Sequence, residues 1–325
     1  MLDGQNRNID YIRISVTDRC NLRCVYCMPE SGIQCLAHDE ILSYEEILHV
    51  CRLLYTLGIR KVKLTGGEPL TRKGLAELVR MLKQDCRMES VTLTTNGILL
   101  TEQLPELVRT GIDGVNISLD TLDRRRFMEI ARRDQLERVL EGIRFALTFP
   151  KLNVKINCVP RMDAPEDALA IAGLAKDHNL SIRFIEMMPI GLGRGAEGMR
   201  EAELMHRIEG IYGKMMPCEQ TMGNGPAHYY HIQGFQGRIG FISAISHKFC
   251  NTCNRIRLTA DGYLKTCLQY ESGVHLKEKL RSGVDDAQLL QFIRDAVMDK
   301  PTGHHFMEED GETDLEQRHM SQIGG

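Results

Sequence analysis

Several features that mark common protein classes are missing from this chain of 325 residues. It has no apolar run long enough to span a membrane, and its start, "MLDGQNRNID", lacks the basic and then apolar layout of a signal peptide. Its 41 basic and 44 acidic residues nearly cancel, so it has no long-range attraction for nucleic acid or an anionic membrane. It also lacks a Walker-type phosphate loop and long-period repeats. These absences predict a cytoplasmic protein that binds neither nucleic acid nor a membrane.

Cysteine, in contrast, is abundant. The chain has eleven, an odd number, and six of them fall into two tight groups. Disulfides rarely persist in a reducing compartment, so clustered cysteines indicate metal ligands. The other five are predicted to be small, buried apolar residues: Cys35, Cys51, Cys86, Cys158 and Cys218.

The first two thirds of the chain alternates short β-rich runs with helical patterns. Ser43 and Glu46 form a capping box for a helix that ends near Gly58. Such alternation predicts parallel strands with right-handed crossovers, and it fits both a doubly wound sheet and a partial barrel. In either fold, chemistry belongs at the carboxyl ends of the strands. The predicted strands are residues 11–16, 60–64, 90–95, 114–119, 153–159 and 181–187. The predicted helices are residues 43–57, 73–84 and 102–109, a helical stretch after the fourth strand that ends near residue 148, residues 165–178, and the segment "REAELMHRIEGIYG".

The pattern changes near residue 217. "CEQTMGNGPAHYY" is typical of a linker, and two short strands are predicted after it, at residues 229–232 and 237–245. A hairpin around "ADGY" and a helix over residues 286–300 follow. The polar end, "HHFMEEDGETDLEQRHMSQIGG", is predicted to be mobile.

The first cysteine group, Cys20, Cys24 and Cys27, has the spacing C-x3-C-x2-C in one loop. A closed zinc site needs four ligands, and Cys35 or His38 could complete one. A cubic four-iron cluster fits better, because three thiolates hold three irons and leave the fourth open to a ligand.

This spacing, with Tyr26 before the last cysteine, resembles the signature of radical S-adenosylmethionine enzymes. "GGEP", after the second predicted strand, resembles the loop of that superfamily that receives the methionine amino group. The resemblance implies that the open iron chelates S-adenosylmethionine and that one electron cleaves it to methionine and a 5′-deoxyadenosyl radical.

The second group, Cys250, Cys253 and Cys267, again has three cysteines, spaced C-x2-C-x13-C. Alone it fits a zinc ribbon that lacks a ligand as well as it fits a cluster. With "RFIEMMPIG", "CNTCNRIRLTADG" and a final Gly-Gly, however, the chain resembles the GTP 3′,8-cyclases from Arg13 to its end. The resemblance implies an α/β fold: a partial (βα)6 TIM-like barrel over residues 1–217 and a cluster-binding α+β extension over residues 218–325.

The same resemblance implies site residues and two [4Fe-4S] clusters, one on each cysteine group. S-adenosylmethionine is expected at Tyr26, Gly67, Ser118 and Met188. The expected GTP contacts are Arg13, Lys63, Thr94, Lys155, Arg255, Ile256 and Arg257. Position 63 is more often arginine in the family, so lysine there keeps the charge but loses the bidentate fork. Gly324 and Gly325 are expected to reach the active site and assist catalysis.

The implied reaction is the first step of molybdenum-cofactor biosynthesis. The 5′-deoxyadenosyl radical abstracts H3′ of GTP, and C3′ then attacks C8 to give (8S)-3′,8-cyclo-7,8-dihydroguanosine 5′-triphosphate. The implied partners are GTP, a flavodoxin- or ferredoxin-type electron donor and the downstream cyclic pyranopterin monophosphate synthase; a homodimer is allowed. The alternative is a radical S-adenosylmethionine enzyme that modifies peptides and holds an auxiliary cluster, although such enzymes usually carry more than three cysteines in this region.

Overall fold

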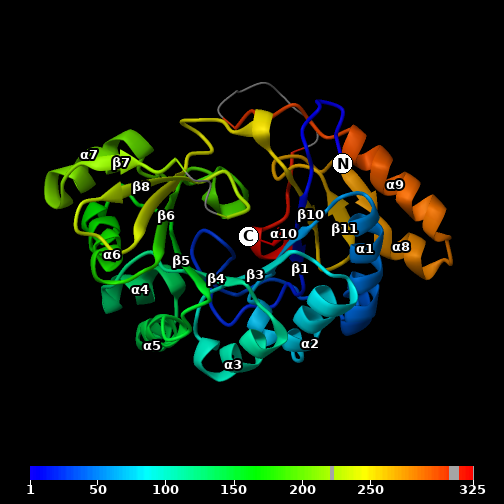
Figure 1. The fold of residues 1–325 in the computed structure, drawn as a ribbon, viewed down its shortest axis with the longest axis horizontal. Coiled ribbons are helices and arrows are strands. Elements are labelled where there is room, and N and C mark those ends of the chain that lie inside the picture. The colour runs from blue at the N-terminus through cyan, green and yellow to red at the C-terminus, as the bar shows by residue number, and fades with distance from the viewer. Residues whose placement is uncertain (220–222, 307–314, 325) are drawn as a thin grey trace.

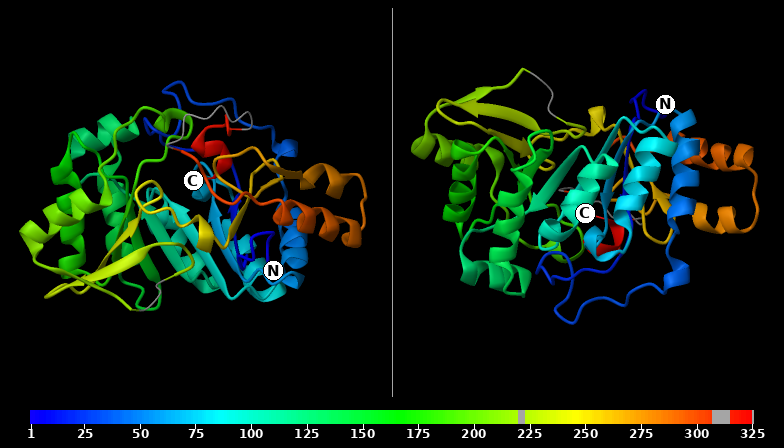
Figure 2. Two further views of the ribbon diagram at one scale, coloured as in Figure 1. Left: turned by 90° about the horizontal axis from the view of Figure 1, so that it is seen from above. Right: turned by 60° about the horizontal axis from the view of Figure 1, so that its bottom comes forward.

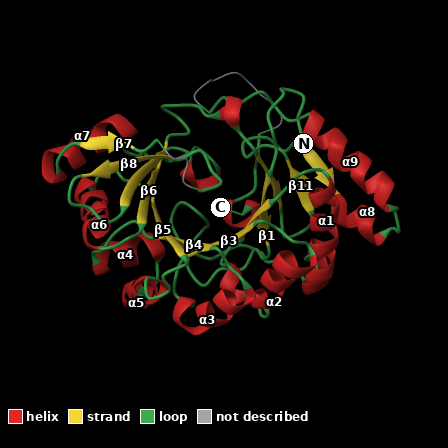
Figure 3. Ribbon diagram, in the orientation of Figure 1, coloured by secondary structure: helices red, strands yellow, loops and turns green. Residues whose placement is uncertain are grey.

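The computed structural model describes residues 1–219, 223–306 and 315–324. In this part of the chain, one sheet of twelve strands curves around a central space, and helices cover its outer face (Figures 1 and 3). The sheet order is β12-β11-β10-β1-β2-β3-β4-β5-β6-β9-β8-β7. The two edge strands, β12 and β7, are not neighbours in this order, so the barrel is partial as predicted.

Six parallel strands form the centre of the sheet, and all six were predicted. Their inward and outward side chains alternate, with apolar residues such as Ile12, Leu64 and Ile117 fully buried. The strands are β1 (Tyr11–Ser15), β2 (Lys61–Thr65), β3 (Ser90–Thr95), β4 (Gly114–Ser118), β5 (Asn153–Cys158) and β6 (Ser181–Ile185). The helices that follow them are α1 (Tyr44–Thr56), α2 (Leu75–Arg80), α3 (Leu100–Thr110), α4 (Arg124–Ala131), α5 (Leu136–Ala146), α6 (Pro165–Asp177) and α7 (Glu201–Tyr212).

The capping box of α1 is confirmed. The Glu46 backbone N–H donates to the Ser43 hydroxyl at 3.1 Å, and the Ser43 N–H donates to the Glu46 carboxylate at 2.7 Å. The helix predicted over residues 73–84 is shorter in its regular part: α2 passes into a π-helical turn, η3 (Met81–Asp85).

The helical stretch predicted up to residue 148 is two helices, α4 and α5. Arg132 adopts a left-handed conformation (φ 53°), which ends α4. The last carbonyls of α4 have hydrogen-bond partners outside the helix. The backbone N–H groups of Val25 and Arg23 donate to the carbonyls of Ile130 and Ala131, respectively, at 3.0 Å. The end of α4 therefore supports the first cysteine loop.

The C-terminal part extends both edges of the central sheet. β9 (Arg238–Ile242) pairs in parallel with β6, and β10 (Arg255–Leu258) pairs in parallel with β1. The predicted hairpin at "ADGY" is confirmed as β10 and β11 (Tyr263–Lys265), whereas β7 was not predicted. The predicted boundary at residue 217 stays a prediction, since strands from both sides share one sheet. The remaining elements are β7 (Met215–Pro217), β8 (His228–Ile232), β12 (Gly273–His275), α8 (Leu276–Arg281), α9 (Asp286–Met298), α10 (Met320–Ile323) and the 3-10 turns η1 (His38–Glu40), η2 (Pro69–Thr71), η4 (Gly191–Gly193) and η5 (Cys250–Thr252).

The prediction of a mobile polar end is wrong for residues 315–324. Glu316 is 1% exposed and forms an ion pair with the fully buried Lys265 of β11. Ile323 of α10 is buried as well, and the chain end lies inside the curve of the sheet (Figure 1). Local composition missed this packing because the partner of Glu316 is 51 residues away in the sequence. Among the described residues, no helix is long and apolar enough to cross a membrane.

Candidate active site

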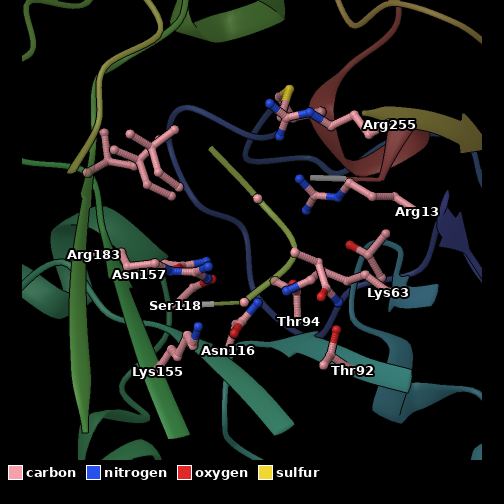
Figure 4. Close-up of a pocket in the computed structure, with 18 of the residues that line it drawn as sticks. Arg13, Lys63, Thr92, Thr94, Asn116, Ser118, Lys155, Asn157, Arg183 and Arg255 are labelled. Atoms are coloured by element: carbon pink, nitrogen blue, oxygen red, sulfur yellow. The ribbon is translucent and has the colours of Figure 1, made fainter. Parts of the chain in front are cut away.

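A cavity of about 770 Å³ occupies the space inside the curved sheet. Both cysteine groups line it, together with the inward side chains of the central strands. Figure 4 shows side chains from β1 to β6 pointing into this space. A volume of this size suits small-molecule ligands.

The first cysteine loop follows β1, where the sequence predicted chemistry. Cys20, Cys24 and Cys27 all line the cavity. Burial, the main cause, raises the pKa of the Cys20 thiol to about 11 and that of Cys27 to about 12. Thiolates that are buried in this way are stabilised by a bound cation, and the iron ions of a metal cluster would supply that positive charge.

The geometry does not favour a single zinc ion. Among the residues that the structure describes, no three His, Cys, Asp or Glu side chains converge on one metal ion. A cubic cluster needs no such convergence, because each thiolate binds a different iron. Cys35 and His38 do not line the cavity, so nothing in the described geometry brings them to the three cysteines.

The GGEP loop lies directly against the backbone that follows β1. A Cβ at Gly67 would lie 2.4 Å from the Arg19 carbonyl oxygen, so only glycine fits there. The next residue, Glu68, is buried and accepts hydrogen bonds from Thr95 and from the backbone of Asn96 and Leu70. Burial raises the pKa of Glu68 to about 7. Glu68 thereby ties the loop after β2 to the loop after β3.

The other predicted S-adenosylmethionine residues, Tyr26, Ser118 and Met188, line the same cavity. The Tyr26 hydroxyl donates to Asp120 at 2.6 Å, and the Val159 N–H donates to the other Asp120 oxygen at 2.8 Å. Asp120 was not predicted as a site residue, although it ends the segment "NISLD" at the carboxyl end of β4. Its carboxylate fixes the position of the tyrosine ring.

In the second cysteine group, Cys250 begins η5, Cys253 directly follows η5, and Cys267 lies in the loop after β11. Cys250, Cys253 and Cys267 line the cavity. Burial would raise the pKa of Cys253, but the charges of Arg255 and Lys300 outweigh it and lower that pKa to about 6. This thiol therefore forms its thiolate, the metal-binding form, more readily than the first group does.

Cationic side chains from five strands line the cavity: Arg13, Lys63, Lys155, Arg183, Arg255 and Arg257 (Figure 4 labels the first five). Burial lowers the pKa of Lys63 well below its usual range, and repulsion from Arg183 and Arg13 adds to the effect. Burial also lowers the pKa of Lys155 to about 8. Like charges held this close, out of water, favour a polyanionic ligand.

Three observations refine the predicted substrate residues. Arg183 was missed, although an arginine inside the apolar run "SIRFI" of β6 could have signalled it; its guanidinium donates to Asn157 at 2.9 Å. Ile256 is fully buried and does not line the cavity, so it could meet a ligand only through its backbone. Thr94 does line the cavity, and its buried hydroxyl has no hydrogen-bond partner among the described residues. Such an orphaned hydroxyl fits a ligand-binding role.

The chain end reaches the cavity wall. Arg257 Nη1 donates to the Gly324 carbonyl at 2.9 Å. Gly324 has φ 86°, and a Cβ there would lie 3.0 Å from Ser15 and Thr65. A side chain at this position would be strained and crowded. Gly325 lies outside the described residues.

Comparisons with known proteins agree with this site. Residues 14–159 match the radical SAM superfamily, and residues 180–306 match the family described as Molybdenum Cofactor Synthesis C. The chain is 42% identical over 326 residues to GTP 3′,8-cyclase of Clostridium perfringens (strain 13 / Type A). It is 45% identical over 329 residues to GTP 3′,8-cyclase of Pelotomaculum thermopropionicum, and both alignments cover 100% of each chain.

Solved structures show the fold. Streptococcus suis SuiB bound to S-adenosylmethionine has a TM-score of 0.66 and 12% identity, covering 90% of this chain and 68% of that one. SuiB bound to its precursor peptide SuiA has a TM-score of 0.62 and 14% identity, covering 89% and 67%. At such low identity the likeness extends to the fold alone. Full-length identity above 40% decides the family, and this chain belongs to the GTP 3′,8-cyclases of the radical S-adenosylmethionine superfamily.

Proposed function

We propose that this chain converts GTP to (8S)-3′,8-cyclo-7,8-dihydroguanosine 5′-triphosphate in the first step of molybdenum-cofactor biosynthesis. The observation that carries the proposal is one cavity lined by two three-cysteine groups and by cationic side chains from five strands of the sheet. The cysteine groups suit two [4Fe-4S] clusters, and the cations suit a triphosphate. The peptide-modifying alternative is not favoured, because the full-length relatives are cyclases.

The first site would be built by Cys20, Cys24 and Cys27, with the glycine backbone at Gly67 and the ring of Tyr26 beside it. A cluster held there would supply the electron for cleavage of S-adenosylmethionine. Gly67 lets the loop after β2 pack directly against the Arg19 carbonyl, and the hydrogen bond to Asp120 fixes the position of Tyr26. Ser118 and Met188 line the same space and would contact the adenosyl part.

The second site would be built by Cys250, Cys253 and Cys267, and a cluster bound there would supply a binding position for the guanine base of GTP. Arg13, Lys63, Lys155, Arg183, Arg255 and Arg257 would bind and orient the phosphates, and Thr94 offers a buried hydroxyl. Lys63 keeps the charge of the usual arginine with a single ammonium group, which makes one-point contacts. The enclosing sheet keeps water from the reacting ribose.

In the proposed reaction, the C3′–H bond of GTP would break by hydrogen transfer to the 5′-deoxyadenosyl radical that S-adenosylmethionine would supply. A bond would then form between C3′ and C8, and the product radical would be quenched by one proton and by one electron from the external reductant. The protein contributes position: GTP and S-adenosylmethionine must be held so that the two carbons meet. Arg257 holds Gly324 at the cavity wall by a hydrogen bond, and in this proposal the tail would close the side of the cavity that binds the phosphates.

The test is product formation by protein reconstituted without oxygen. With reductant, S-adenosylmethionine and GTP, we expect the cyclised nucleotide by mass spectrometry, and none with ATP, whose purine lacks the guanine edge. Absence of the product from protein shown to hold both clusters contradicts the proposal. The flavodoxin- or ferredoxin-type donor, the downstream synthase, a homodimer and a cytoplasmic location remain predictions from family resemblance and composition.

A further inference from the structure

The ten residues before β1 lie against the second cysteine group and the end of α9. In Figures 1 and 2 the N-terminus lies beside the C-terminal helices. The approach is close: a Cβ at Gly4 would lie 2.4 Å from the carbonyl oxygen of Met298 in α9. The Asn254 amide further donates to Asp10 at 2.7 Å.

Arg7 is the centre of this contact. Its side chain is 5% exposed, and its Nε donates to the buried Asp3 carboxylate at 2.6 Å. Nη1 donates at 3.0 Å to the carbonyls of Cys250 and Thr302. Nη2 donates to the carbonyls of Lys300 and Pro301 at 3.3 and 2.7 Å. One buried cation thus joins a cysteine of the second group to residues 300–302.

Lys300 does the same for the other two cysteines. It is 4% exposed and lines the cavity. Its ammonium donates to the Arg255 carbonyl at 3.2 Å and to the Thr266 carbonyl. Arg255 is two residues after Cys253, and Thr266 directly precedes Cys267. Both contacts are made to backbone carbonyls, so the side chains proposed to bind the triphosphate take no part in them.

We propose that Arg7 and Lys300 are positioning residues that pre-form the binding site of the second cluster and balance its negative charge. The proposal rests on the proposed function, since it assumes a cluster on Cys250, Cys253 and Cys267. Each of these cysteines has a carbonyl, its own or that of a residue within two positions, bound to one of the two cations. Three thiolates give such a cluster a net negative charge, which grows on reduction. Buried cations beside it therefore favour binding and favour the reduced state.

A purely structural role would give a different result. If the two cations only stabilise the folded protein, their removal lowers the unfolding temperature but leaves the reduction potential of a bound cluster unchanged. If they position the cluster, iron retention and potential change together. Mutation of the groups that hold metal ligands in place typically lowers metal affinity by about 10- to 100-fold.

The experiment uses the full chain with Cys20, Cys24 and Cys27 replaced by alanine, so that only the second site can hold a cluster. In this background Lys300→Met and Arg7→Met are compared with matched controls. Lys277→Met removes a lysine that donates to the Glu40 carbonyl at 2.6 Å in an exposed place. Arg60→Met removes an arginine that donates to the Tyr55 and Ile59 carbonyls away from the cavity. Iron and sulfide per chain are measured after a chelator challenge, followed by the midpoint potential and the unfolding temperature.

We expect the background chain and both controls to retain about four irons. Lys300→Met and Arg7→Met should lose iron at about 10-fold lower chelator concentration, and their remaining cluster should have a lower midpoint potential. Lys300→Arg should restore retention. Equal retention and equal potential in all variants overturn the inference alone. No iron and sulfide in the background chain overturns the second cluster of the proposed function, and the inference with it. If a methionine variant does not fold, Lys300→Gln replaces it in the test, because glutamine keeps N–H donors but removes the positive charge. An unchanged midpoint potential of the cluster in Lys300→Gln would contradict the charge-balancing role.

Discussion

The two cysteine groups line one cavity but differ in the charged side chains beside them. Around Cys20, Cys24 and Cys27 the nearby charges include buried carboxylates: Glu68 adds to the raised pKa of Cys20, and Asp120 adds to that of Cys27. Around Cys253 the nearby charges are Arg255 and Lys300, which lower its pKa to about 6.

This difference indicates a division of labour within one cavity. S-adenosylmethionine carries a positive sulfonium, which suits a site with buried carboxylates, whereas a triphosphate suits the cationic side. Two sites of like charge would have competed for the same ligand. The contrast therefore supports S-adenosylmethionine at the first group and GTP at the second.

The largest expected effect comes from removing one cysteine from each group. Cys24→Ala should abolish formation of 5′-deoxyadenosine, because the first cluster loses a ligand. Cys267→Ala should keep deoxyadenosine formation while GTP binding and cyclisation fall below detection. Both products are measured by mass spectrometry in the same reaction. Full cyclisation by Cys267→Ala would remove the substrate role of the second group.

Deletion of Gly324 and Gly325 should reduce cyclisation about 100-fold while iron content stays that of the full chain. The hydrogen bond from Arg257 to Gly324 is then lost, and the phosphate side of the cavity opens to water. Positioning losses of this size are typical of misplaced reacting groups. Replacing Gln317, an exposed residue of the same tail, with alanine serves as the control. Unchanged turnover after the deletion would show that the tail has no part in catalysis.

Arg183→Met should weaken GTP binding by about 2 kcal/mol, or about 30-fold in Kd. The free protein should not lose stability in proportion, because the change also relieves repulsion with Lys63 and Lys155. Calorimetry of GTP binding and thermal unfolding measure the two effects. Arg109→Met, at an exposed site, should change neither. Equal losses of affinity and stability would mean that Arg183 has a structural role.

The smallest expected effect is a pH dependence from Lys155. Its pKa is lowered to about 8, so the cation is present below that pH and is lost as pH rises through it. GTP affinity should be flat near pH 7 and fall a few-fold toward pH 9, since one linked proton gives at most about tenfold per unit.

The stability of the free protein should change in the opposite direction. The unfolded chain holds the Lys155 proton more tightly than the folded chain, so between about pH 8 and the ordinary lysine pKa this residue's contribution favours folding as pH rises. Lys155→Arg should remove both dependences. An unchanged pH profile in that variant would assign the titration to another group.

The strands and the cysteine loops could be predicted because their signals are local. Alternation in "YIRIS" and the cysteine spacing each need only a few neighbouring residues. The buried ion pair of Lys265 with Glu316 and the contacts of Arg7 with residues 300–302 could not be predicted in this way. Their partners are far apart in the sequence, and an isolated charged residue is normally solvated. The tail was accordingly expected to be mobile from its composition, although the family resemblance pointed to the active site.

S-adenosylmethionine and GTP are proposed to meet in one cavity, and a labelled substrate tests this most directly. Reconstituted, reduced protein is given S-adenosylmethionine and GTP deuterated at C3′, and the 5′-deoxyadenosine is weighed by mass spectrometry. We expect one deuterium in the deoxyadenosine, because the 5′ carbon and C3′ must lie in contact. Deoxyadenosine without deuterium, from protein that holds both clusters, would contradict this placement of GTP.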